Sequence, residues 1–163
     1  MFPRDIEDAA DRLLQACRAR NLWVTTAESC TGGLLGAALT CAPGTSAVFD
    51  RGFITYSNAA KVVLLGVDKG LLERHGAVSP EVAQAMAQGA KTKAGADIGI
   101  GVTGVAGPGG GSEGKPVGLV HFGVALRDGF VIHREKRFGD LGRDQVRLEA
   151  VRYGLQLLIE AAG

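Results

Sequence analysis

Apolar residues recur at helical spacing at both ends of the chain. Those near the N-terminus fall three or four residues apart and predict an amphipathic helix: Ile6, Ala10, Leu13, Leu14 and Cys17. A second set with the same spacing predicts a long closing helix: Leu148, Val151, Leu155, Leu158 and Ala162. The chain is therefore expected to begin and end with helices that each bury one face.

Between these helices, short apolar runs alternate with helical patterns. The runs that are rich in β-branched or aromatic residues predict strands at 22–26, 48–56 and 96–102. The helical patterns predict helices at 32–39, 59–65 and 80–94. Ser57 supplies a turn or cap before the second of these helices. Ser79 is expected to cap the third, because the Pro80 that follows suits a first helical position.

Two further strands are predicted at 117–126 and 130–138, on either side of Arg127-Asp128-Gly129. An Asp-Gly pair in so short a link is typical of a β-hairpin, so these two strands are expected to be antiparallel. The order of elements predicts an α/β protein: a three-layer α/β/α sandwich around a mixed, mostly parallel sheet of about five strands with a C-terminal antiparallel hairpin. No linker or repeat interrupts the 163 residues, so we expect a single domain over residues 1–163.

The composition excludes several classes of protein. A formal net charge of +1 provides no basic field for nucleic acid. No apolar run is long enough to cross a membrane, and acidic residues such as Asp5 and Glu7 exclude a secretory signal at the N-terminus. Three cysteines without C-x-x-C spacing, Cys17, Cys30 and Cys41, indicate reduced thiols in a cytoplasmic protein.

Glycine is unusually frequent in this chain, and several of the glycines lie in a loop predicted at residues 103–116. From Gly109 this loop nearly matches the phosphate-binding pattern G-x-x-x-x-G-K-[ST]. Pro116 replaces the hydroxyl that would hold Mg²⁺, and a strand rather than a helix follows, so a nucleoside triphosphate site is excluded. Two interpretations remain: a loop whose N–H groups wrap a phosphate or ribose, or a mobile surface loop.

A polar cluster, Thr26 to Gly33, connects the first predicted strand to a helix. Ligands bind at this edge of α/β sheets, and the helix N-terminus there offers free N–H groups. Ser29 is either a nucleophile or the cap of the helix. Cys30 is either a thiol activated by the helix N-terminus or a small buried side chain.

Tyr56 and Lys61 follow the second predicted strand and are expected at the same edge as Ser29. A lysine beside a serine activates the hydroxyl group when burial lowers the pKa of the amine. The alternative for Lys61 is an ordinary surface lysine.

Arg143 lies in the first turn of the closing helix, after a cap predicted at Asp140. A cation at this end opposes the helix dipole, which indicates either an anionic ligand or pairing with Asp140 or Asp144. The histidines have no carboxylate or thiol at ligand spacing, so neither a metal site nor a cofactor is predicted; they are His75, His121 and His133.

Taken together, these motifs resemble the CinA C-terminal domain, or nicotinamide-nucleotide amidohydrolase, family over essentially the whole chain. The residues that carry the resemblance are Ala27-Glu28-Ser29-Cys30-Thr31-Gly32-Gly33, Tyr56-Ser57-Asn58 with Lys61, Gly76-Ala77-Val78-Ser79, Thr103-Gly104-Val105-Ala106-Gly107-Pro108 with Gly109-Gly110, and Lys115-Pro116-Val117-Gly118. Val105 stands where Ile is commoner in the family, a change that leaves the polar atoms untouched.

The resemblance implies a hydrolase that deamidates nicotinamide mononucleotide in NAD recycling, and a three-layer sandwich with one antiparallel strand. By motif, Ser29 matches the proposed nucleophile, and Tyr56 and Lys61 match the groups proposed to activate it. Thr103 and Gly104 match residues that line the family's pocket, and Arg143 matches the basic residue of its final helix. Larger family members carry an additional N-terminal domain.

We expect Lys61, with Tyr56, to take the Ser29 proton as Ser29 attacks the carboxamide carbon. N–H groups from Thr31 to Gly33 are expected to stabilise the oxyanion, and the glycine loop with Arg143 to hold the phosphate and ribose. Attack by a bound water that Ser29 orients would use the same residues. The expected substrate-binding residues are Glu28, Cys30, Thr31, Gly32, Gly33, Thr103, Gly104, Gly107, Gly109 and Arg143.

Two rival functions stay open: a non-catalytic nucleotide-binding module linked to competence or DNA repair, and an amidase for a related pyridine amide. Release of ammonia from nicotinamide mononucleotide separates the first rival from the enzyme. No nucleic-acid or membrane partner is expected. A homo-oligomer, with a dimer favoured, is expected because small α/β enzymes commonly form symmetric dimers.

Overall fold

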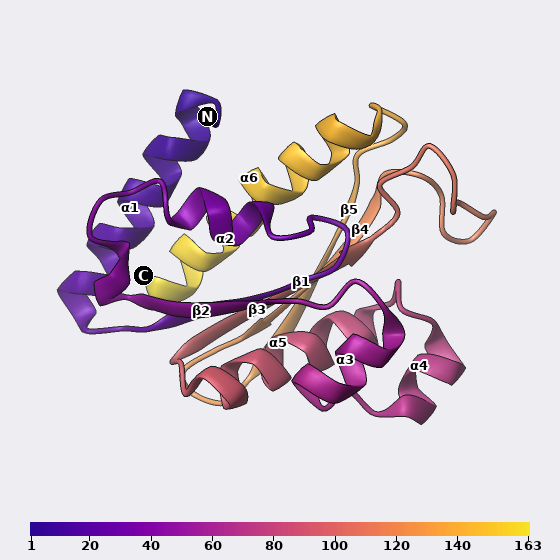
Figure 1. Cartoon of the computed structure of the whole chain (residues 1–163), viewed down its shortest axis with the longest axis horizontal. Helices are drawn as coiled ribbons and strands as arrows, with labels where there is room; N and C mark the ends of the chain where they lie inside the picture. The colour runs from indigo at the N-terminus through magenta and orange to yellow at the C-terminus, as the bar shows by residue number, and fades with distance from the viewer.

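The computed structural model describes residues 1–163 (Figure 1). Its strands are β1 (Val24–Glu28), β2 (Phe49–Ile54), β3 (Ile98–Gly104), β4 (Leu119–Ala125) and β5 (Val131–Arg137). Its helices are α1 (Arg4–Arg20), α2 (Leu34–Leu39), α3 (Asn58–Leu65), α4 (Lys69–His75), α5 (Pro80–Ala94) and α6 (Arg143–Ala162), with a short 3₁₀ turn, η1, at Thr45–Ala47. No helix is both long enough and apolar enough to span a membrane.

The five strands form one sheet in the order β2-β1-β3-β4-β5. β1 pairs in parallel with both β2 and β3, whereas β4 is antiparallel to β3 and to β5. β4 is therefore the one strand that runs against the other four. This topology confirms the mixed, mostly parallel sheet and its C-terminal hairpin.

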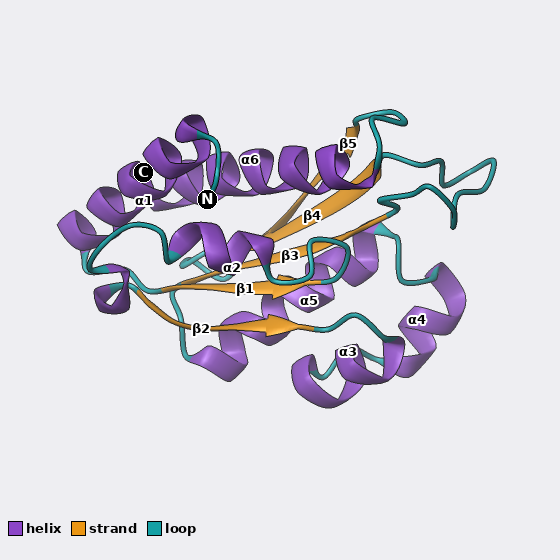
Figure 2. Ribbon diagram, turned by 45° about the horizontal axis from the view of Figure 1, so that its top comes forward, coloured by secondary structure: helices purple, strands orange, loops and turns teal.

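Helices cover both faces of the sheet, which confirms the three-layer sandwich (Figure 2). The larger core cluster lies between the sheet and the layer of α1, α2 and α6. The second cluster lies on the other face, beneath α3, α4 and α5. Gly101 on β3 and Gly123 on β4 face α5, and a Cβ at either position would overlap the carbonyl oxygen of Ala83. α5 therefore packs directly on the backbone of the sheet.

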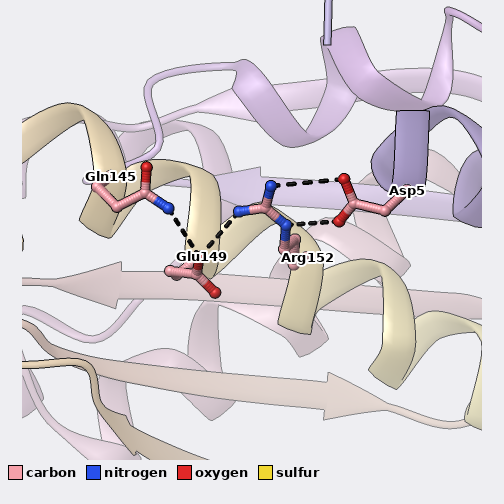
Figure 3. A network of polar contacts seen from close by, with 4 residues as sticks. All are labelled: Asp5, Gln145, Glu149 and Arg152. Atoms are coloured by element: carbon pink, nitrogen blue, oxygen red, sulfur yellow. Dashed lines mark hydrogen bonds and ion pairs between the residues drawn. The ribbon is translucent and has the colours of Figure 1, made fainter. Parts of the chain in front are cut away.

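An ion-pair network ties α6 to α1 (Figure 3). Arg152 Nε lies 2.6 Å from Asp5 Oδ2, and Arg152 Nη1 lies 2.8 Å from Glu149 Oε1. Gln145 donates a further hydrogen bond to Glu149. These side chains are exposed or partly exposed, so the ion pairs contribute little to the stability of the fold. The network joins the middle of α6 to the first turn of α1, away from the cavity at the carboxyl ends of β1 and β3.

Several features differ from those predicted. β1 continues to Glu28, because its last two residues are buried and hydrogen-bonded between β2 and β3. α4 was not predicted; it is only seven residues long, and the Asp68 side chain caps it by accepting from the N–H of Leu71. α6 begins at Arg143 after Gly142, with no side-chain cap, so the expected cap at Asp140 is wrong. The caps expected at Ser57 and Ser79 are confirmed.

Candidate active site

A cavity of about 300 Å³ opens where the carboxyl ends of β1 and β3 meet the segments after β2 and before α5. This volume lies at the lower end of the range for small-molecule sites, about 300–1,000 Å³. Nine of the expected site residues line it: Ser29, Cys30, Tyr56, Lys61, Thr103, Gly104, Gly107, Gly109 and Arg143. A larger hollow of about 480 Å³ between Leu22 and Leu126 lies far from these groups and has no nucleophile in its lining.

Ser29 and Lys61 are in contact at the base of this cavity. Ser29 follows β1 directly, and its N–H donates to the carbonyl of Val102 on β3, which holds the residue at the strand end. Lys61 Nζ donates hydrogen bonds to Ser29 Oγ at 3.1 Å and to the Thr55 carbonyl at 2.7 Å. The two residues are therefore positioned for proton transfer between hydroxyl and amine.

Lys61 is buried, with 1% of its surface exposed, and no carboxylate pairs with it. Lys61 and Leu65 are the two buried residues of α3 and stand one helical turn apart, so both belong to its core-facing side. Burial lowers the pKa of the Lys61 amine, because desolvation disfavours its charged form. A neutral amine at this position can accept the Ser29 proton.

Cys30 lies next to Ser29 but has a different environment. Its side chain is buried, and burial raises the pKa of the Cys30 thiol to about 12. The thiol is therefore protonated at neutral pH and packs as a small apolar group in the core.

Glu28 does not line the cavity, contrary to its expected contact with substrate. Its carboxylate is buried and accepts hydrogen bonds from the N–H groups of Gly33, Leu35 and Gly36, at 2.8–3.0 Å. The carboxylate thus caps the N-terminus of α2, an arrangement that the helix dipole favours.

Thr31, Gly32 and Gly33 also lie outside the lining. The Gly32 N–H donates to the Ser29 carbonyl, and the Gly33 N–H donates to Glu28. The expectation that both glycine N–H groups stabilise an oxyanion is corrected accordingly, because each already has an acceptor within the chain.

Arg143 crosses the mouth of the cavity. Its guanidinium donates to the Gly107 carbonyl at 2.8 Å and to the Tyr56 hydroxyl at 2.9 Å, and it forms no ion pair with Asp140 or Asp144. Tyr56 is largely exposed, and its hydroxyl is engaged by Arg143 rather than by Ser29 or Lys61. Tyr56 and Arg143 therefore form the rim of the site, above the Ser29–Lys61 pair.

The glycine loop and the segment before α5 form the remaining walls. Thr103 Oγ1 donates to the Ala77 carbonyl at 2.8 Å, which brings Ala77 and Val78 into the lining. Gly104 is required by close packing, because a Cβ there would lie 2.6 Å from the Leu119 carbonyl oxygen. Ala77 and Val78 were not among the expected site residues. The sequence signal for them was the Gly76-Ala77-Val78-Ser79 motif, which leads directly into α5. The polar cluster from Thr26 to Gly33 leads into α2 in the same way.

The lining contains the Arg143 guanidinium and no carboxylate. Because no acid accompanies this positive charge, the cavity is suited to a ligand that carries negative charge. Away from the cavity, His121 Nδ1 and His133 Nε2 lie 3.0 Å apart on β4 and β5, and no group of three His, Cys, Asp or Glu side chains is arranged to hold a metal ion.

Comparison with known proteins gives the family. The model of the CinA C-terminal domain matches residues 6–162. The chain belongs to this family. The CinA C-terminal domain fold is also found in the crystal structure of the competence/damage inducible protein CihA from Agrobacterium tumefaciens, with a TM-score of 0.97 and 50% identity, covering 100% of this chain and 99% of that one.

CinA relatives of two lengths are similar to this chain. The nicotinamide-nucleotide amidohydrolase PncC of Enterobacter agglomerans is 54% identical over 157 residues, which cover 96% of this chain and 94% of the relative. PncC of Escherichia coli K12 is 47% identical over 159 residues, which cover 97% and 95%. A CinA-like protein of Synechococcus sp. RCC307 is 54% identical over 158 residues, but the chain spans only 38% of that relative's length.

Proposed function

We propose that this CinA-family chain is a nicotinamide-nucleotide amidohydrolase, which hydrolyses the carboxamide of nicotinamide mononucleotide to nicotinate mononucleotide and ammonia. The observation that carries the proposal is the buried amine of Lys61, 3.1 Å from Ser29 Oγ and free of any carboxylate partner. The two PncC relatives, matched over almost their full length, support the choice of a linear amide as the bond that is cleaved.

In the acylation step, Ser29 Oγ forms a bond to the carboxamide carbon while its proton passes to Lys61 Nζ. The negative charge that develops on the amide oxygen requires hydrogen-bond donors close to Ser29. When the tetrahedral intermediate collapses, the carbon–nitrogen bond breaks, and Lys61 returns the proton to the departing nitrogen. Ammonia leaves, and the nicotinoyl group stays on Ser29 as an ester.

In the deacylation step, Lys61 takes a proton from water as the hydroxide oxygen bonds to the acyl carbon. The bond between that carbon and Ser29 Oγ then breaks, and Ser29 regains a proton from Lys61. The net reaction consumes one amide and one water and yields a carboxylate and ammonium. This route uses the same base twice, as expected for a serine–lysine pair.

The nucleotide part of the substrate is assigned to the rim. Arg143 supplies the positive charge, and its guanidinium has hydrogen atoms left for a phosphate after bonding Gly107 and Tyr56. The N–H groups of Gly109 and Gly110 have no acceptor within the chain and lie in the lining. We assign the phosphate to these donors and the ribose to the wall between Val78 and the loop.

We further propose that residues 1–163 act as one domain, in the cytoplasm, as a homodimer. The free state of Cys17, Cys30 and Cys41 supports a reducing compartment. Two apolar side chains are exposed, Ile54 on β2 and Val63 on α3, and they support a contact with a second copy of the chain.

The test is release of ammonia from nicotinamide mononucleotide by the purified chain, with the nucleotide product identified by mass spectrometry. Nicotinamide and nicotinamide riboside serve as comparison substrates. Tight binding of the nucleotide without ammonia release would contradict the proposal and favour a non-catalytic binding module. Faster release of ammonia from a smaller pyridine amide would show that the chain is an amidase of different specificity.

A further inference from the structure

Buried polar atoms without a partner are rare in folded proteins, and here they gather around Ser29. Three buried side-chain atoms have no hydrogen-bond partner: Thr31 Oγ1, Thr55 Oγ1 and Arg147 Nε. Thr31 lies in the turn that follows Ser29, and the carbonyl of Thr55 accepts from Lys61. Arg147 stands out because it belongs to a distant helix and carries a charge.

Arg147 lies on α6, one turn after Arg143, and reaches the back of the Ser29 turn. Its Nη2 donates to the Thr31 carbonyl at 3.1 Å, and a Cβ at Gly32 would lie 3.3 Å from the same nitrogen. No carboxylate forms an ion pair with it. An uncompensated guanidinium thus rests against the backbone of the turn, on the side away from the cavity.

The same turn contains two backbone N–H groups with no acceptor. From Ser29 to Leu34, four residues donate to an acceptor within the chain: Ser29, Gly32, Gly33 and Leu34. The N–H groups of Cys30 and Thr31 do not, although both residues are buried. Almost all buried N–H groups are paired in native structures. Cys30 lines the cavity, so its N–H is available for an acceptor that arrives with the substrate, whereas Thr31 is fully buried outside the lining.

The geometry points to the Cys30 N–H as an oxyanion donor of the Ser29 reaction, and to Arg147 as the positioning residue that holds its turn and places positive charge behind it. This inference rests on the proposed function for its amide substrate. The N–H groups at the start of α2 are not assigned this role, because those of Gly33, Leu35 and Gly36 already donate to the Glu28 carboxylate. The N–H of the residue after a nucleophile is a common oxyanion donor, and Cys30 holds that place.

Arg147 acts on the turn in two ways. Its hydrogen bond to the Thr31 carbonyl limits rotation of the peptide group that follows Thr31, one residue after the Cys30 donor. Its charge favours the negative charge that develops on the amide oxygen. Both effects stabilise the transition state and leave the affinity for the substrate almost unchanged. Loss of Arg147 should therefore lower kcat rather than raise KM.

The experiment compares Arg147→Met, which keeps an unbranched apolar stem without the charge or hydrogen bonds, with Arg147→Lys, which keeps the charge. Arg152→Met is the matched control: it removes an arginine from the same helix, but that side chain pairs with Asp5 and Glu149 (Figure 3). For each variant we would measure kcat and KM for ammonia release, the Kd of nicotinate mononucleotide and the melting temperature.

A second reaction makes the test independent of the natural substrate. With 4-nitrophenyl acetate, Ser29 Oγ bonds to the acetyl carbon, its proton passes to Lys61, and 4-nitrophenolate leaves. The rate of 4-nitrophenolate release is followed optically, and acetylation of Ser29 is checked by mass spectrometry of the intact protein and its peptides.

Arg147→Met should lower both kcat and the rate of Ser29 acetylation about 10- to 150-fold, the range expected for loss of one charge-assisted hydrogen bond. The Kd of nicotinate mononucleotide should stay at the parent value, Arg147→Lys should recover part of the loss, and Arg152→Met should leave both rates unchanged. A kcat and acetylation rate equal to those of the parent would overturn the inference.

A parallel loss of product affinity and melting temperature would also overturn it, because Arg147 would then be purely structural. If Arg147→Met does not fold, a full recovery of both rates by Arg147→Cys on addition of ethylguanidinium supports the inference, and its absence in a folded protein contradicts it. If the parent releases no ammonia but Ser29 acetylation still depends on Arg147, the proposed function fails and this inference stands.

Discussion

The guanidinium of Arg143 and the hydroxyl of Tyr56 lie 2.9 Å apart, although 87 residues separate them along the chain. Their contact joins the segment after β2 to the start of α6 over the mouth of the cavity. The glycine loop is drawn into the same rim, because Arg143 also bonds the Gly107 carbonyl. Substrate recognition at the rim can therefore be tested separately from chemistry at its base.

Arg143→Ala should weaken recognition of the phosphate. Loss of a charge-assisted hydrogen bond, worth about 1.5–3 kcal/mol, corresponds to a fall of roughly 10- to 150-fold in kcat/KM for nicotinamide mononucleotide. Nicotinamide riboside should be a poor substrate of the parent and should lose much less on mutation. Measuring kcat/KM for both substrates with both proteins gives a double-mutant cycle in which Arg143 and the phosphate are the two partners. Equal proportional losses of kcat/KM on the two substrates would show that Arg143 does not contact the phosphate. Tyr56→Phe, which keeps the ring, is the milder companion variant.

Ser29→Ala should abolish turnover while the affinity for nicotinate mononucleotide is kept, since a nucleophile acts only in the transition state. Cys30→Ala should retain most of the activity, because its buried thiol is protonated at neutral pH. Rates of ammonia release and product Kd values decide the matter. An inactive Cys30→Ala beside an active Ser29→Ala would reverse the choice of nucleophile.

Lys61 should determine the rising limb of the pH–rate profile. The limb should lie below the ordinary lysine range, because burial lowers the pKa of the amine and only the neutral form accepts the Ser29 proton. Lys61→Met should lose about 10²–10⁴-fold in kcat, the usual contribution of a positioned base. Lys61→Arg should not restore activity, because arginine stays protonated. An active arginine variant would leave Lys61 with an electrostatic role only.

The same burial should appear in the pH dependence of stability. A lowered lysine pKa in the folded state means that the unfolded chain binds more protons between the folded-state and the unfolded-state pKa values. The free energy of unfolding of the parent, relative to Lys61→Met, should therefore rise with pH in that window, by up to about 1.4 kcal/mol per pH unit. Urea titrations at several pH values measure the difference, and a flat difference would mean that Lys61 is charged in the folded protein.

Glu28→Gln should destabilise the fold and disturb the Ser29 turn. The carboxylate accepts from three N–H groups with two oxygens, whereas an amide offers one oxygen and turns its NH₂ group toward other donors. The expected loss is about 1.5–3 kcal/mol in the free energy of unfolding, with lower kcat and unchanged product affinity. Glu160→Gln, at an exposed site on α6, is the control. Unaltered stability would contradict the capping role.

The sequence predicted the features that depend on local pattern. Alternation and the Asp-Gly link identified the β4–β5 hairpin, and Ser57 and Ser79 marked two helix starts because capping is a local interaction. α4 escaped prediction because seven residues with Gly70 near the start give no clear period. Motif order placed nine expected residues around one cavity, since strand ends of a parallel sheet meet at one edge.

What the sequence could not supply depends on tertiary partners. Glu28 reads as a polar site residue, but in the fold its carboxylate faces the backbone of α2 instead of the cavity. Lys61 has the polarity of a surface residue. It is buried because it lies on the side of α3 that faces the core, as Leu65 does one turn later. Arg147 carries no local signal at all: its contact with Thr31 spans 116 residues and arises only when α6 packs beside α2.

The close contact between α5 and the sheet limits how the cavity of this chain can be widened. Gly101 and Gly123 leave no room for side chains beneath Ala83, one turn into the helix that follows the Ala77–Val78 wall. The spacing of helix and sheet, and with it the width of the cavity, is therefore fixed by the backbone itself. Room for a bulkier ligand on this scaffold would therefore have to come from the glycine loop or from the Tyr56–Arg143 rim, which lie outside the packed interface of α5 with the sheet.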